Sequence, residues 1–173
     1  ARIALWDRFI SRVLVLHSLN RLGYLLFQFP PWIVFSERNL KWFKRIAKLA
    51  SPARVAIEVR HRSWLDKGNR ERFLDLLRDQ NMAFTAVDEP SLEWTVPPEW
   101  NITATWGTVL RFHGRNAPAW SKRDAKVAER FNYLYDITEL APFSEKAKVF
   151  AKEGSRVFLM FNNCFRDNAV RNA

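Results

Sequence analysis

The sequence predicts an α/β fold built around a parallel sheet. Five short apolar segments have the length of strands, amphipathic helical segments separate them, and the composition is globular, at 48% hydrophobic residues and 5 glycines. Strands that alternate with helices are typical of βα units, because parallel neighbours need a long crossover connection. No shift of composition marks a boundary, so we expect a single domain over residues 1–173.

The first half of the chain contains three helix–strand pairs. The helix expected over 5–20 has apolar side chains at helical spacing and ends in a turn that contains Gly23. The strand expected over 24–29 is stopped by Pro30 and Pro31, since proline cannot donate to a sheet ladder. The next two pairs are a helix over 37–50 with a strand over 55–60, and a helix over 67–80 with a strand over 83–88.

The second half begins with a proline-rich loop over 90–106. A strand is expected over 108–113, where apolar and polar side chains alternate. Helical patterns near 122–131 and over 137–153 then lead to the last strand, over 156–162. Five strands separated by helices favour a parallel sheet over a sandwich.

Alternation within the strands separates an apolar face from a face that ends in polar side chains. In the strand over 55–60, Glu58 and Arg60 share one face, and Ile57 and Val59 share the other. We assign the polar ends of all five strands to the face away from the helices. In a barrel that face is the interior, and barrel enzymes keep their active sites at the carboxyl ends of the strands. The side chains expected to converge there are Gln28, Glu58, Arg60, Asp88, Arg111, His113 and Asn162.

These residue types point to acid–base chemistry on an anionic substrate. Glu58 and Asp88 are the expected catalytic acid and base, or the ligands of a shared metal, and His113 is the expected proton shuttle. Mixed carboxylate, histidine and asparagine ligands suit Mg²⁺ or Mn²⁺, so a divalent metal stays an open alternative. The forked donors of Arg60, Arg111 and Arg115 suit phosphate or carboxylate.

Structural roles stay open for the same side chains. Glu58 with Arg60, or Asp88 with an arginine of the next strand, would form ion pairs that fill a barrel interior. Buried charges cost several kcal/mol unless they are well paired, which argues against five polar strand ends as stability devices. His113 alone fits a hydrogen-bonded core histidine. Its neighbour Gly114 permits a tight turn at the strand end and favours the catalytic interpretation.

The formal net charge of +10 suggests a polyanion partner, and most of the excess lies in residues 1–60. The helix over 37–50 carries five cations on one face, which is either a solvated face or a phosphate-binding surface. Indoles in the loops after strands would stack on bases, and they serve sugars equally well. These indoles are Trp64, Trp94, Trp100, Trp106 and Trp120.

Several classes of protein are excluded by the sequence. Apolar runs are interrupted before about 18 residues accumulate, so no transmembrane helix is expected, and no secretory signal is recognised. The single cysteine, Cys164, excludes an internal disulfide and a cysteine zinc site, and it predicts a reducing, cytoplasmic compartment. No P-loop and no GxGxxG motif is found, which argues against Walker-type hydrolysis and a Rossmann cofactor.

Six segments together resemble the YecE-like proteins, also called domain of unknown function 72. They are LGYLLFQFPP (22–31), VAIEVRHRSW (55–64), FTAVDEP (84–90), LRFHGRN (110–116), FNYLYDITEL (131–140) and FNNCFRDNAVRNA (161–173). The resemblance implies a TIM-barrel-like (βα) fold that is incomplete here, with strands similar to the fourth to eighth of eight. Cys164 departs from the family pattern, which usually has histidine or another polar residue after the paired asparagines.

From these residues and this resemblance we expect a substrate pocket at the carboxyl ends of the strands. The substrate-binding residues we expect are Gln28, Arg60, His61, Trp64, Arg111, Arg115, Asn116, Tyr133, Asn162 and Asn163. The best-supported function is a hydrolase or lyase acting on a phosphate-bearing small molecule or nucleic acid. A non-catalytic module that binds nucleic acid or another polyanion is the alternative, and a carbohydrate isomerase or hydrolase comes third. A catalytic site requires a carboxylate or histidine with a shifted pKa at an open pocket, whereas a binding module requires continuous basic surface.

Overall fold

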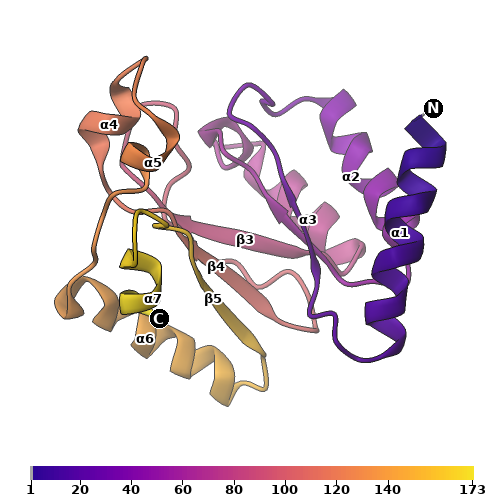
Figure 1. Cartoon of the computed structure of the whole chain (residues 1–173). Helices are drawn as coiled ribbons and strands as arrows, with labels where there is room; N and C mark the ends of the chain where they lie inside the picture. Colours follow the sequence, from indigo (N-terminus) through magenta and orange to yellow (C-terminus); the bar gives the residue numbers. More distant parts are fainter. Residues whose placement is uncertain (1) are drawn as a thin grey trace.

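The computed structural model describes residues 2–173 and contains five parallel strands in one curved sheet, in the order β1-β2-β3-β4-β5 (Figure 1). The strands are β1 (Leu25–Gln28), β2 (Val55–Glu58), β3 (Ala83–Asp88), β4 (Thr108–Phe112) and β5 (Val157–Phe161). Each strand pairs with the next one along the chain, as in a barrel wall. The curvature brings Gln28 of β1 within hydrogen-bond distance of Arg111 on β4. The predicted α/β parallel fold is therefore confirmed.

Helices connect the strands, and the longer ones lie beside the sheet (Figure 1). They are α1 (Arg2–Ser18), α2 (Glu37–Ala50), the short 3-10 helix η1 (Arg62–Trp64), α3 (Arg70–Asp79), α4 (Ala117–Ser121), α5 (Val127–Arg130), α6 (Ile137–Lys152) and α7 (Asn168–Asn172). Local caps set their starts: the Ser36 hydroxyl accepts from Asn39 N–H at α2, and Asp136 with Glu139 forms a capping box at α6.

The helix expected over 122–131 is wrong for most of its length. Only α5 lies within it, and α4 ends before it. The reason is a competing set of side-chain bonds, because the Asn116 amide donates to the carbonyls of Glu129 and Asn132 and folds this segment back on itself. Lys122 is extended and interrupts the helical pattern.

An aromatic core packs between the sheet and the helices α2 and α3. The Trp64 ring lies 4.9 Å from Phe43 and 5.0 Å from Phe73, measured between centroids, and all three side chains are buried. Burying each such side chain contributes about 1.5–3 kcal/mol relative to leaving it exposed. This core fixes the helices on one face and leaves the concave face of the sheet for the polar strand ends.

Strand register confirms the predicted faces of β1, β2, β4 and β5 and corrects those of β3. Ile57 pairs with Phe84, and Val87 pairs with Arg111, so Phe84, Ala86 and Asp88 point toward the helices. Every residue of β3 is buried, so its alternation lacked the polar contrast that marks a face. Phe84 packs on Phe73 of α3 and sets this orientation.

Candidate functional site

A buried carboxylate, Glu58 at the end of β2, is the centre of the polar network on the concave face. Its Oε2 accepts a short hydrogen bond from Arg111. Its Oε1 lies 3.0 Å from His113 Nε2 and accepts from Arg60 Nη1 at 3.4 Å. Glu58 and His113 are both fully buried. The ends of two strands, β2 and β4, therefore bring together the predicted residues Glu58, Arg60, Arg111 and His113.

Asn162, just after β5, fixes the hydrogen-bonding direction of this network. Its Oδ1 accepts from Arg111 Nη2 at 2.9 Å, so its Nδ2 faces His113 Nδ1 at 3.0 Å. The histidine Nδ1 must then accept, and its Nε2–H donates to Glu58. Gln28 completes the set, because its Oε1 accepts from Arg111 Nη1 at 2.8 Å.

The surroundings keep Glu58 charged and His113 neutral. Burial alone would raise the pKa of Glu58, but the hydrogen bond from His113 and the charges of Arg111 and Arg60 outweigh it and lower the pKa to about 2. Burial lowers the pKa of His113, and the two guanidinium groups add to this effect. A carboxylate this acidic is a poor proton acceptor, so Glu58 does not fit the predicted catalytic base.

Glu89, a carboxylate that the sequence analysis missed, follows β3 and points to the same side as the network. Its Oε2 lies 2.7 Å from Arg60 Nη2 as an ion pair, and its Oε1 accepts from Val96 N–H at 3.1 Å. Its side chain is 1% exposed. Burial raises the pKa of Glu89 to about 7 even though Arg60 opposes the shift. The available signal was the acidic doublet Asp88-Glu89 in FTAVDEP.

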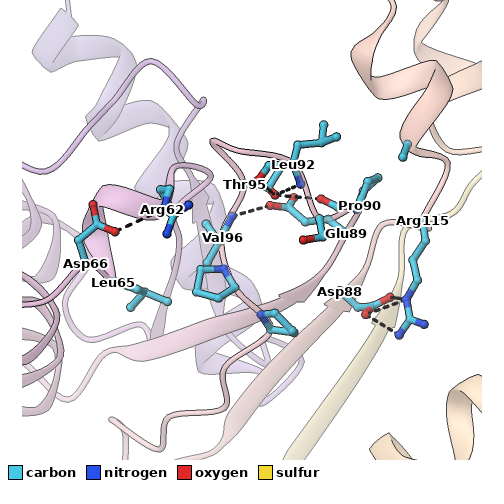
Figure 2. A pocket seen from close by; sticks show the side chains of 14 residues that line it. Arg62, Leu65, Asp66, Asp88, Glu89, Pro90, Leu92, Thr95, Val96 and Arg115 are labelled. Carbon is cyan, nitrogen blue, oxygen red and sulfur yellow. Dashed lines mark hydrogen bonds and ion pairs between the residues drawn. The ribbon is translucent and has the colours of Figure 1, made fainter.

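Glu89 lines a cavity of about 650 Å³ beside the carboxyl ends of the strands. Figure 2 shows Arg62 and Asp66 at one end of this cavity and Asp88 and Arg115 at the other, with Glu89 between them. A shifted carboxylate at an open pocket is the feature expected of a catalytic site.

Asp88 does not join Glu58, which corrects the predicted pair of catalytic carboxylates. Its carboxylate accepts from Arg115 Nε and Nη2 at 2.8–3.1 Å and from the Tyr135 hydroxyl at 2.5 Å. The cause is the orientation of β3, which sends Asp88 to the helix side of the sheet. Asp88 therefore pairs with Arg115, and not with the arginine of the neighbouring strand.

The predicted anion site of three arginines is also wrong as a single site. Arg60 and Arg111 lie on the concave face, where both contact Glu58. Arg115 lies with Asp88 and bonds Glu139 through Nη1 at 3.2 Å. Each of these guanidinium groups already contacts carboxylate, which offsets its charge.

Three other predicted substrate-binding residues have structural contacts. Trp64 is a core side chain whose Nε1–H donates to the carbonyl of Ile33, so its predicted role at the surface is wrong. His61 caps η1 by accepting from Ser63 N–H, and Asn116 caps α4.

Asn163 is buried behind the site and belongs to the packing of the C-terminal segment. It donates to the carbonyl of Tyr133 and to Asn172 Oδ1. The Tyr133 hydroxyl donates to Glu139, beside Arg115. Gly114 passes close to this segment with φ +85°, and a Cβ there would lie 2.6 Å from Tyr133 Cβ. Gly114 thus has the positive φ that glycine permits, but residues 113–116 do not form the predicted tight turn.

The loop tryptophans do not form one stacking surface. Trp120 covers Arg60 at 5.0 Å and stacks on Trp94 with centroids 6.2 Å apart. Trp100 packs against Phe143, and Trp106 stacks on Tyr24. Only the Trp94–Trp120 pair belongs to the site.

Two further features concern the part of the chain that the structure describes. Over residues 2–173, no three His, Cys, Asp or Glu side chains gather as a metal-binding group. Within the same residues, each helix is too short or too polar to cross a bilayer.

The family model described as "Protein of unknown function DUF72" matches residues 1–173. The chain belongs to the DUF72 family. UPF0759 protein YunF of Bacillus subtilis (strain 168) is 31% identical, and the match covers 97% of this chain and 61% of YunF.

Solved DUF72 structures have the same fold. A DUF72 family protein of Thermotoga maritima MSB8 matches with a TM-score of 0.87 and 30% identity over 96% of this chain and 61% of its own. One from Enterococcus faecalis V583 matches with a TM-score of 0.93 and 26% identity over 99% of this chain and 63% of its own. The chain thus spans about three-fifths of the length of these relatives.

Proposed function

We propose that this DUF72 chain carries the acid–base site of a hydrolase or lyase that acts on a small phosphate-bearing substrate. The observation that carries the proposal is Glu89, a buried carboxylate with a pKa of about 7 that lines the cavity. Such a group is present in both protonation states at neutral pH, so it both donates and accepts protons efficiently.

The remaining network holds Glu89 in place. Arg60 contacts its Oε2 and is itself fixed by Glu58 on one side and by the Trp120 ring on the other. His113 orients Glu58. In this proposal Glu58 and His113 are positioning residues, and Glu89 exchanges the proton with substrate.

The size of the cavity supports a small molecule as substrate. Its volume of about 650 Å³ lies within the range usual for small-molecule sites. Arg60, Arg111 and Arg115 give the polyanion-binding alternative no support, because all three contact carboxylates.

The test compares Glu89→Gln with Glu93→Gln, a change at an exposed glutamate on the same loop. Turnover of a panel of phosphate-bearing small molecules is measured with and without Mg²⁺ or Mn²⁺. We expect Glu89→Gln to lower kcat by about 10²- to 10⁴-fold, the usual contribution of a general acid or base. Full activity of Glu89→Gln, or an equal loss in Glu93→Gln, would contradict the assignment.

A further inference from the structure

We propose that Arg62 binds the phosphate group of the substrate, so that a phosphate monoester lies between Arg62 and Glu89 in the cavity. The inference rests on the proposed function and adds to it the residue that recognises the anion. Sequence reasoning singled out three other arginines and omitted Arg62.

Two guanidinium groups line the cavity, and within residues 2–173 only that of Arg62 has a nitrogen without a hydrogen-bond partner. Arg115 uses Nε and Nη2 on Asp88 and Nη1 on Glu139. Its charge is therefore shared between two carboxylates. A phosphate there would meet both negative groups, which disfavours binding.

Arg62 is anchored but not neutralised. Its backbone N–H donates to the carbonyl of Trp94 at 3.0 Å, and its Nη1 donates to the carbonyl of Glu93 at 3.2 Å. These bonds tie it to the loop that forms the cavity wall. Its third guanidinium nitrogen, Nη2, has no hydrogen-bond partner among residues 2–173.

Asp66, the carboxylate beside Arg62, competes only weakly with phosphate for the Arg62 guanidinium. Asp66 Oδ1 lies 3.4 Å from Nε, and the two side chains are 47% and 55% exposed. Exposed ion pairs of this kind contribute about 0–1 kcal/mol. A phosphate dianion carries more charge and accepts two parallel N–H bonds from a guanidinium, so it displaces such a contact.

The wall between Arg62 and Glu89 indicates what the rest of the substrate looks like. Leu65, Val96 and Pro97 line the cavity, and Figure 2 shows Val96 between the two charged groups. The surface suits an apolar or ring-shaped organic portion. Phenyl phosphate should therefore bind more tightly than inorganic phosphate.

The experiment measures binding of inorganic phosphate and phenyl phosphate to the full chain by titration calorimetry at pH 7. We expect Arg62→Gln to weaken both by at least tenfold, and Arg62→Lys by less, because lysine keeps the charge but loses the fork. Arg78→Gln is the matched control, since Arg78 is a similarly exposed arginine that pairs with Asp75 on α3. It should leave both affinities unchanged.

Two results would overturn the inference: wild-type protein that binds neither probe, or Arg62→Gln that binds both as tightly as wild type. Loss of binding in a folded Arg115→Gln variant, with Arg62→Gln unaffected, would move the anion to Arg115. The proposed function is tested separately, because Glu89→Gln should keep phosphate binding while it loses turnover. Phosphate binding that depends on Arg62, with turnover intact in Glu89→Gln, would support this inference and refute the role of Glu89.

Discussion

Replacing Glu89 with glutamine should change how the stability of the protein depends on pH. The pKa of Glu89 is raised from about 4.5 to about 7 in the folded state, mainly by burial. A folded protein that holds a proton more tightly than the unfolded chain loses stability as pH rises. The contribution of Glu89 to the stability of the wild type is therefore lost as pH rises from 4.5 through 7, and Glu89→Gln should lack that loss.

The size of the effect follows from the shift. One pKa unit corresponds to about 1.4 kcal/mol, so a shift from 4.5 to about 7 corresponds to about 3 kcal/mol. This contribution is fully present below pH 4.5 and is lost as pH passes through 7. Between pH 4.5 and pH 8, the difference in unfolding free energy between variant and wild type should change by about 3 kcal/mol in favour of the variant.

For two other groups in the site, the contribution to stability depends on pH in the opposite direction. Glu58 has a lowered pKa, so its contribution is present above pH 4.5 and is lost as pH falls toward 2. His113 also has a lowered pKa, so stability falls as the pH drops below about 6.5 and the unfolded histidine takes up a proton. Both groups are present in wild type and variant, so subtracting wild type from the variant at each pH removes their contributions except the part coupled to Glu89 through Arg60.

The assay is urea unfolding followed by tryptophan fluorescence at several values of pH between 4.5 and 8. Glu93→Gln serves as the control, because its exposed side chain should give a curve parallel to wild type. A constant offset between Glu89→Gln and wild type across this range would refute the raised pKa. It would also remove the main support for proton transfer by Glu89.

Three further changes test the surrounding contacts by the same unfolding assay at pH 7. Glu58→Gln should destabilise by about 3–5 kcal/mol, because it removes the carboxylate partner of Arg111 and one of the two carboxylates that contact the buried Arg60. Tyr135→Phe should cost about 1–3 kcal/mol, since Asp88 loses a donor and Gly114 N–H loses its acceptor. Gly114→Ala should cost at least about 1 kcal/mol, because φ is +85° and its Cβ would meet Tyr133. An effect under about 0.5 kcal/mol, typical of a surface change, would contradict any of the three.

Sequence periodicity was sufficient for the sheet and for most of the concave network. Gln28, Glu58, Arg111 and Asn162 meet as predicted, because period-two alternation in a parallel sheet places neighbouring strand ends on one face. The face of β3 was not predictable in this way, since both of its faces are buried and each carries one polar side chain, Thr85 or Asp88. Its orientation follows from packing between Phe84 and α3, a contact between distant segments that alternation does not encode.

Long-range contacts also decided which charged side chains are free to bind a ligand. An arginine at a strand end and an arginine in a loop look alike in the sequence. The structure separates them by their partners: Arg111 is bonded to the buried Glu58, whereas the Arg62 side chain is bonded to the carbonyl of Glu93 and to the exposed carboxylate of Asp66. Charge patterns in the sequence therefore locate the polar edge of the sheet. Which of its arginines can still bind a ligand depends on their ion pairs in the folded protein.

The acidic doublet at the end of β3 explains why two polar networks border one cavity. Consecutive residues of a strand point to opposite faces, so Asp88 contacts Arg115 on the helix side and Glu89 contacts Arg60 on the concave side. The surroundings then separate their behaviour. Asp88 accepts from Arg115 and from the Tyr135 hydroxyl, whereas the buried Glu89 has a pKa of about 7. Neighbours of identical chemistry thus take different roles, one as the partner of an arginine and the other as the group that titrates at neutral pH.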